Sequence, residues 1–303
     1  SDLDSEGRWS GGNTTVVQVG DQIDGKVDGG QVRFTDMNEL KVIQYVEHLQ
    51  RQAHDQGGNV ISLLGNHELR SSSRKYFDTY YSCCVNPHDE SFGDKNTRQK
   101  LLAAGGLIAT RVFSKRPVVV NIGKLVFSHA DIGAFSPENN GVFRTYSTPS
   151  TLSFQFTFDG LNNASFNYLQ KKALTKTTME QNNALLFHDS GPLYSRHLCT
   201  TPLMNVVKGR YIFIAGHTTV DTISTNENQN VWCTDTKMSE ALMRFEEPSK
   251  SSERYDAWRV QVQNHHINHV QVLEITNPLS EEPTFTVLKA KDKIEQGRGV
   301  YFF

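Results

Sequence analysis

The stretch Val16-Val17-Gln18-Val19 is an apolar, β-branched run, and it ends in Gly20-Asp21-Gln22-Ile23-Asp24. The same order returns further along, where Val60 to Leu64 precedes Gly65-Asn66-His67-Glu68. Short apolar runs of this kind predict buried strands. In an open α/β sheet, ligand sites form just past the carboxyl ends of the strands. The sequence therefore predicts an α/β fold with a polar site at the ends of these two strands.

A helix is predicted between the two strands, from Asp36 to Gln52. Leu40, Ile43 and Val46 recur at helical spacing, so one face of this helix should pack on the sheet. We expect Asp36 to be its N-cap, with Glu39 completing a capping box three positions later.

Two further polar clusters follow predicted strands. Ser128-His129-Ala130 comes after the second arm of a predicted hairpin, and Gly216-His217-Thr218 comes after Tyr211 to Ala215. Taken singly, a Gly-Asp pair usually marks a turn, and a histidine at a strand end usually has a structural role. Four such clusters in one chain favour a shared site instead.

The four clusters supply oxygen and nitrogen ligands suited to a divalent transition metal. The candidate ligands are Asp21, Asn66, His129 and His217. A bound metal would lower the pKa of a water molecule and polarise a phosphoryl oxygen. His67 could then protonate a leaving group, with Asp24 tuning its pKa.

The composition excludes some partners. The 303-residue chain has 37% hydrophobic and 21% charged residues and a net charge of −2. This balance gives no electrostatic case for nucleic acid or an anionic membrane surface. No stretch is apolar enough, for long enough, to span a bilayer. We expect one domain over residues 1–303.

Cysteine usage bears on the compartment. The chain has four cysteines, Cys83, Cys84, Cys199 and Cys233, and their spacing matches neither a zinc motif nor a small disulfide framework. We therefore expect reduced thiols and a cytoplasmic protein.

The motifs at Gly20, Gly65, Ser128 and Gly216 resemble, in residues and in order, those of the calcineurin-like metallophosphoesterases. The chain is most similar to the Shewanella-like branch of the phosphoprotein phosphatases. The stretches that carry this closer resemblance are Trp9 with Gly11-Gly12-Asn13, Phe92-Gly93, Gly105-Gly106, Gly191-Pro192-Leu193-Tyr194-Ser195-Arg196 and Thr234 to Ser239. The resemblance implies a β-sandwich of two mixed sheets flanked by helices, with the active site at the strand carboxyl ends.

The resemblance also implies roles for individual residues. Asp21 would bridge two divalent metal ions, manganese, iron or zinc, and the other three ligands would complete the shell of one of them. His67 would be the general acid and Asp24 would support it, while Arg196 would contact the substrate phosphate. A metal-bound hydroxide would attack the phosphorus atom of a phosphomonoester. The substrate would be a protein phosphorylated on Ser/Thr or Tyr, or a small phosphate ester.

The chain departs from the family pattern at two points. The first family motif, Asp-x-His before the Gly20 cluster, has no counterpart, so one metal site lacks its usual ligands. We expect that the chain lacks an N-terminal strand-helix segment; the alternative is a protein that has lost half of its metal centre. Gly25 also stands where the family has an arginine that clamps phosphate. The cations that could replace it are Lys26, Arg70, Arg74 and Arg98.

Three alternatives stay open at this point. The chain could be a nucleotide-directed phosphoesterase that cleaves dinucleoside polyphosphates or phosphodiesters, or a catalytically dead binding module. Separately, a set of phenylalanines could form either a lid over the site or part of the core. These are Phe143, Phe154, Phe156 and Phe158.

Overall fold

The structure is a computed structural model, and parts of the chain are described in it. The described residues are 7–24, 38–78, 90–130, 135–138, 142–145, 155–188, 191–196, 199, 211–236 and 271–289.

The predicted strand–helix–strand unit is confirmed. Strand β1 (Thr15–Gln18) pairs in parallel with β2 (Asn59–Ser62), with Val16 opposite Val60, and α1 (Glu39–Asp55) connects them. Val46 and Leu49 of α1 pack on a small cluster that includes buried Trp9 and Val60. Strand β1 is half-buried rather than fully buried, since its first residue is exposed and the next three are partly covered.

Helix α1 begins later than predicted. Its N-cap is Asn38, whose side chain accepts a hydrogen bond from the backbone N–H of Lys41. The prediction of Asp36 as N-cap was wrong, and Asp36 itself lies outside the described residues. Glu39 is not part of a capping box at that position either, because its carboxylate points inward and is 2% exposed.

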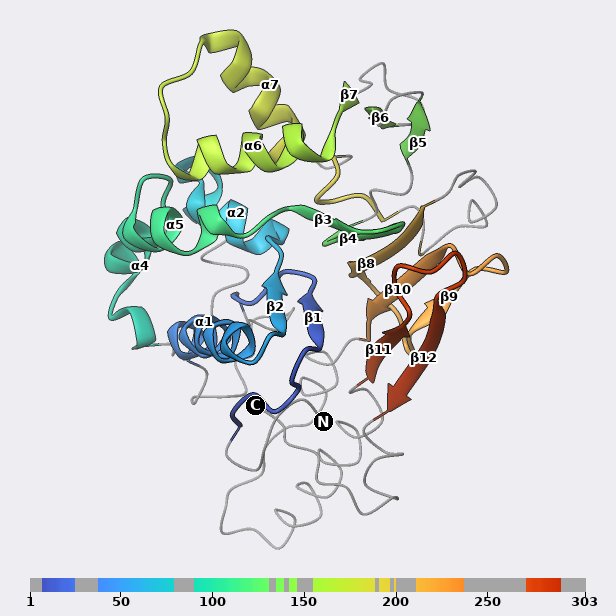
Figure 1. Ribbon diagram of the computed structural model, residues 1–303. Helices are drawn as coiled ribbons and strands as arrows, with labels where there is room; N and C mark the ends of the chain where they lie inside the picture. Colours follow the sequence, from blue (N-terminus) through green and yellow to red (C-terminus); the bar gives the residue numbers. More distant parts are fainter. Residues whose placement is uncertain are drawn as a thin grey trace, which may run out of the picture.

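A mixed five-stranded sheet has the order β3-β4-β8-β10-β9 (Figure 1). The predicted hairpin is confirmed as β3 (Val119–Ile122) and β4 (Leu125–Ser128), which pair antiparallel. Strand β8 (Ile212–Thr219) runs parallel to β4, β10 (Val231–Asp235) runs parallel to β8, and β9 (Ser224–Thr225) pairs antiparallel with β10.

Both faces of this sheet are buried. Because side chains alternate along a strand, neighbouring residues enter different cores. Val126 of β4 and Phe213 of β8 face a cluster formed with the helices. Phe127 and Ile214, the next residues along, face a second cluster. The second cluster also receives Leu63 just after β2, so it joins the two sheets.

The helices lie to one side of the five-stranded sheet, with α6 and α7 above the others in Figure 1. They are α2 (Asn66–Ser72), α4 (Lys95–Leu102), α5 (Leu107–Arg111), α6 (Phe158–Leu169) and α7 (Lys176–Phe187), with short 3-10 turns η1 (Glu90–Phe92) and η2 (Phe113–Lys115).

Two smaller sheets complete the described part. The hairpin of β11 (Gln271–Thr276) and β12 (Thr284–Lys289) packs on the second cluster, where the rings of Trp232 and Phe285 stack with centroids 4.8 Å apart. The other sheet contains β5 (Phe135–Glu138), β6 (Val142–Thr145) and β7 (Gln155–Phe156).

The lid hypothesis receives no support where it can be checked. Phe156 is 5% exposed and belongs to the helix-side core, and Phe158 packs partly buried against that core. The side chain of Phe143 and all of Phe154 lie outside the described part.

The mixed α/β class predicted from the sequence is confirmed. None of the helices in the described ranges has both the length and the apolar character needed to cross a lipid bilayer.

Candidate metal centre

Asp21 occupies a tight turn just after β1, with φ of 56°. The turn is held by Glu68, whose carboxylate accepts hydrogen bonds from the backbone N–H groups of Asp21 (3.0 Å), Gln22 (2.6 Å) and Gly65 (2.7 Å). Glu68 is fully buried. Glu68 has no role among the sequence predictions, because glycine at the N-cap does not match the capping-box pattern, although the Glu68 carboxylate accepts from the Gly65 N–H as in a capping box.

Two glycines allow the strand ends to meet. A Cβ on Gly65 would lie 2.0 Å from Oδ1 of Asp21, and a Cβ on Gly20 would lie 2.7 Å from the backbone nitrogen of Gly65. Both positions therefore exclude any side chain. This close approach brings the Asp21 turn against the start of α2.

The four predicted metal ligands lie together. His129 Nε2 is 2.9 Å from Asn66 Oδ1, 3.1 Å from Asp21 Oδ2 and 3.2 Å from His217 Nδ1. Asp21, His129 and His217 each offer one ligand atom, and these atoms lie within 4.8 Å of one another. Residues from four separate segments of the chain thus converge on one point.

The donor set fits a cation. His129 Nδ1 is 2.7 Å from the Val19 carbonyl oxygen, which can only accept, so Nδ1 carries a proton and Nε2 is the ring nitrogen left to bind a metal ion. His129 Nε2 faces the oxygens of Asp21 and Asn66. A deprotonated Nε2 and two oxygens at these distances would repel one another, so either a proton on Nε2 or a metal ion is needed among them.

The charged groups of the centre shift one another's pKa values. Burial raises the pKa of Asp21, but the neighbouring His129 and His67 outweigh burial and hold the pKa below its ordinary value. Burial lowers the pKa of His129, but the Asp21 carboxylate outweighs it and raises the pKa.

His217 lies inside strand β8, not past its end as the sequence predicted. Its φ of 59° and a register shift in the β8–β10 pairing turn its side chain toward the centre. Burial, His129 and the Arg196 guanidinium together lower the pKa of His217 to about 3. A neutral imidazole has one nitrogen lone pair, so binding a metal ion through Nδ1 would place the ring proton on Nε2 and end the hydrogen bond from Arg196 to that atom.

His67 lies beside the converging ligands and is paired with Asp24, as predicted. His67 Nδ1 is 3.1 Å from Asp24 Oδ2, and Nε2 is 3.8 Å from Asp21 Oδ2. Burial alone would lower the pKa of His67, but Asp21 and the hydrogen bond to Asp24 raise it to about 9. The raised pKa favours the protonated form of His67, which can donate, when Asp21 carries no metal ion.

Asp24 is itself held by a buried network. Its carboxylate accepts from Ser71 Oγ (3.0 Å) and from Arg98 Nη2 (2.6 Å), and its backbone N–H donates to Glu39 (2.9 Å). Arg98 also forms a close ion pair with Glu39. The suggestion that Arg98 replaces the phosphate clamp is wrong, because its side chain is 3% exposed and committed to these two carboxylates.

Among the remaining candidate cations, Arg196 is the one that contacts the centre from its solvent-exposed side, called the open side below. Arg196 is exposed, and its Nε donates to His217 Nε2 at 3.3 Å. Arg70 donates to the hydroxyl of Tyr194 (3.0 Å), with its guanidinium 4.2 Å from the centre of that ring. Arg74 lines a different pocket, and Lys26 lies outside the described residues.

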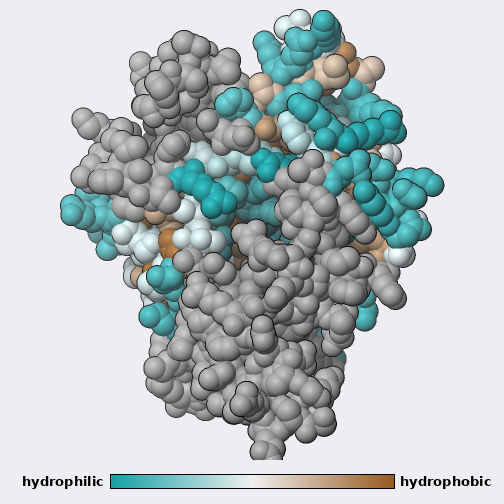
Figure 2. All heavy atoms as spheres, turned by 180° about the vertical axis from the view of Figure 1, so that it is seen from behind, coloured by the Kyte–Doolittle hydropathy of each residue, from teal (hydrophilic) through white to brown (hydrophobic). Residues whose placement is uncertain are grey.

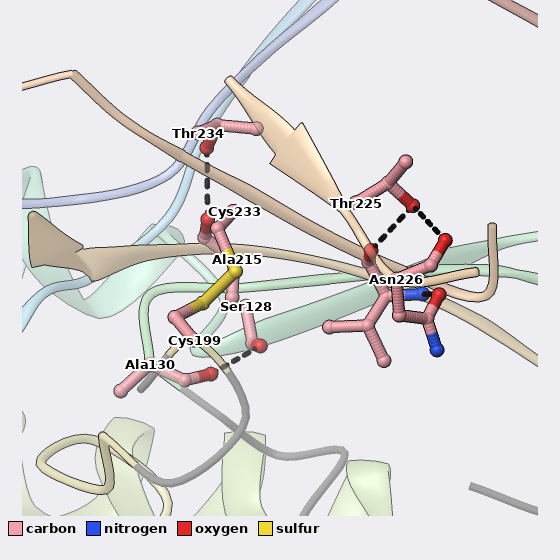
Figure 3. Close-up of a disulfide and its surroundings, with 9 residues drawn as sticks. Ser128, Ala130, Cys199, Ala215, Thr225, Asn226, Cys233 and Thr234 are labelled. Carbon is pink, nitrogen blue, oxygen red and sulfur yellow. Dashed lines mark hydrogen bonds between the residues drawn. A yellow bond between two sulfur atoms is a disulfide. The ribbon is translucent and has the colours of Figure 1, made fainter. Parts of the chain in front are cut away.

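A disulfide joins Cys199 to Cys233, with Cα atoms 6.0 Å apart (Figure 3). The expectation of reduced thiols is therefore wrong for these two cysteines; Cys83 and Cys84 lie outside the described residues. The bond links the segment that follows Arg196 to strand β10, next to β8. Spacing could not reveal it because 34 positions separate the partners.

Comparison with known proteins finds partial similarities. A stretch of 67 residues is 43% identical to Shewanella-like protein phosphatase 2 of Arabidopsis thaliana, covering 22% of this chain and 15% of that protein. A stretch of 64 residues is 36% identical to an uncharacterized protein of Schizosaccharomyces pombe, covering 21% of this chain and 16% of that protein. The matches therefore span about a sixth of each curated relative. The resemblance to the Shewanella-like phosphatases is confirmed over this stretch.

Solved structures of a cold-active protein tyrosine phosphatase also match. The one from a psychrophilic Shewanella species has a TM-score of 0.48 and 17% identity, over 78% of this chain and 65% of that chain. A mutant form has a TM-score of 0.47 at the same identity and coverage. No protein-family model matches the chain.

Proposed function

We propose that this protein is a metal-dependent phosphatase that hydrolyses phosphomonoesters, and that its substrates are phosphoproteins. One observation carries the proposal: Asp21, Asn66, His129 and His217 converge on one point, with the Asp24-bonded imidazole of His67 beside it. The similarity to a protein named as a phosphatase supports the same reaction class.

The four converging residues would hold a divalent metal ion, whose contribution when bound is to polarise a phosphoryl oxygen and lower the pKa of water. Proton donation and binding of the substrate phosphate would be carried out by side chains of the protein. His67 would donate a proton to the leaving oxygen, and Asp24 would fix the ring orientation. Arg196 would bind the substrate phosphate from the open side.

The full family arrangement is part of the proposal. In that arrangement Asp21 would help to hold a second divalent metal ion, with manganese, iron or zinc as the candidates, and the two sheets that share the second cluster would form a β-sandwich. The described residues supply no Asp-x-His pair for that second ion.

The test is hydrolysis of an aryl phosphate by the 303-residue chain, with and without added manganese. We expect hydrolysis that depends on the metal. Asp21→Asn removes the carboxylate among the converging ligands, and His67→Asn removes the proton donor. Each change should lower kcat by at least about 100-fold, the lower end of what acid–base catalysis contributes.

The chain offers a matched control pair. His54 and Asp55 are neighbours at the end of α1, 3.9 Å apart, with side chains 88% and 82% exposed. His54→Asn and Asp55→Asn make the same chemical changes away from the centre, and activity should stay at the wild-type level. Wild-type rates in both the Asp21 and His67 variants would contradict the proposal.

The substrate class is tested by comparing a phosphopeptide with a dinucleoside polyphosphate at equal concentration. Faster turnover of the phosphopeptide is expected. Turnover of the dinucleotide alone would replace the phosphoprotein assignment by the nucleotide-directed one. Metal binding without turnover of either compound would support the binding-module alternative.

A further inference from the structure

A pocket lies apart from the candidate metal centre, between the segment that follows α2 and the helices α6 and α7. Its volume is about 520 Å³, within the range of about 300–1,000 Å³ typical of ligand pockets. None of the predicted metal ligands lines it. The described lining residues are Ser72, Ser73, Arg74, Lys75, Tyr76, Ala104, Tyr168, Lys171, Asn183, Ala184, Phe187 and His188.

One wall of the pocket is aromatic. The Phe187 ring lies 5.7 Å from that of Tyr76 and 5.0 Å from that of Tyr168, measured between centroids. The Tyr168 hydroxyl donates to the Ser72 carbonyl oxygen at 3.4 Å. This wall joins α6 and α7 to the end of α2 and can cover the apolar part of a bound ligand.

The rim of the pocket is positively charged. Arg74, Lys75 and Lys171 are all exposed, and no aspartate or glutamate is found among the described lining residues. Asp78, three positions after Lys75, is instead paired with Lys95 at 2.7 Å. A concave surface lined by charges of one sign concentrates ions of the opposite sign.

Figure 2 shows hydrophilic side chains around small hydrophobic areas where α6 and α7 reach the surface.

Lys171 has an unfavourable backbone conformation. It follows the end of α6 with φ of 51°, at a position where glycine is strongly preferred. Its side chain packs over Gly105, on which a Cβ would lie 3.2 Å from Lys171 Cδ. The Lys171 side chain therefore lines the pocket at a backbone position that carries some strain.

The pocket lies at the opposite end of α2 from the centre. Asn66 begins that helix and Ser72 ends it, and seven residues of helix span about 10 Å. An extended peptide advances about 3.3–3.6 Å per residue. A side chain about three positions from a phosphorylated residue bound at the centre would therefore reach the pocket.

We propose that this pocket binds an acidic side chain of a phosphoprotein substrate, about three residues from the phosphorylated position. The proposal rests on the proposed phosphatase function and adds a substrate class to it. The positive charges of Arg74, Lys75 and Lys171 favour a negatively charged side chain in the pocket. The aromatic wall covers the peptide backbone and the apolar atoms next to that side chain.

The experiment compares two phosphoserine peptides, one with aspartates three and four positions from the phosphoserine and one with asparagines there. The measured quantity is the ratio of their kcat/KM values. The wild-type chain should favour the acidic peptide by about tenfold, as expected for charge complementarity at a partly exposed site. Lys75→Gln/Lys171→Gln should reduce that ratio to below about threefold.

Two controls make the result specific. Lys41→Gln/Lys115→Gln removes two exposed cations that do not line the pocket, and the ratio should stay at the wild-type value. Lys171→Gly should lower the ratio while leaving the melting temperature unchanged or higher, because glycine accepts positive φ. A wild-type ratio near one, or a ratio that survives the double pocket change, would overturn the proposal.

The experiments distinguish an error in the pocket proposal from an error in the proposed phosphatase function. If the wild-type chain hydrolyses no phosphate ester, the proposed function is wrong. Fluorescence anisotropy with a labelled acidic peptide and metal-free protein then tests the pocket alone. Binding that Lys75→Gln/Lys171→Gln weakens supports the pocket, and equal binding by both proteins overturns it.

Discussion

The two sides of the candidate metal centre differ in how their charged residues are held. On one side Asp24, Glu39 and Glu68 are 7%, 2% and 0% exposed, and each accepts hydrogen bonds from backbone N–H groups or from Arg98. On the other side Arg196 is exposed and contacts His217 at 3.3 Å.

This difference indicates that the buried residues position the groups of the centre, whereas the exposed residue is available to bind substrate. The buried carboxylates fix the Asp21 turn and the His67 ring, so their hydrogen-bonding capacity is used within the protein. The guanidinium of Arg196 lies where a phosphate group can reach it. We therefore expect substitutions on the buried side to reduce stability, and substitutions on the open side to reduce substrate binding.

The largest effect is expected from Arg98→Leu. This change leaves Asp24 and Glu39 as buried carboxylates without their cation, which should lower the free energy of unfolding by about 3–5 kcal/mol. Urea denaturation measures the effect. Lys100→Leu, on the exposed face of the same helix, should change the stability little. Equal stability of the two variants would mean that the buried network contributes nothing.

Cys199→Ser should have the next largest effect. Loss of a disulfide that closes a loop of 34 positions should lower the free energy of unfolding by about 3–4 kcal/mol. The same denaturation experiment measures it. Peptide mapping without reductant should recover Cys199 and Cys233 as one linked species, and their recovery as free thiols would refute the cross-link.

Arg196→Gln should have the smallest effect on stability and a distinct effect on catalysis. Loss of a charged hydrogen-bond donor to phosphate is worth about 1.5–3 kcal/mol, so KM for an aryl phosphate should rise about tenfold or more. The melting temperature should stay at the wild-type value. Arg111→Gln, at an exposed position on α5, is the control. An unchanged KM would remove Arg196 from the substrate site.

The candidate centre was largely predictable because its residues follow local patterns. The apolar runs before Asp21, Asn66 and His129 were enough to predict strands, and the parallel pairing of β1 with β2 brings two of the clusters together. Glu39 and Arg98 were misassigned because each carries out its role through a partner far along the chain. Arg98 contacts residues 59 and 74 positions away, and no local pattern encodes such a pairing.

The sequence by itself determined the strands that precede the polar clusters, the helix between the first two of them and the order of the clusters, because periodicity and turn residues act over a few positions. Only the tertiary structure decided which charges became buried, which cysteines paired and that His217 would lie in an irregular part of β8. Those outcomes depend on desolvation and on contacts between distant segments. Desolvation and these distant contacts arise only when the chain has folded around its hydrophobic clusters.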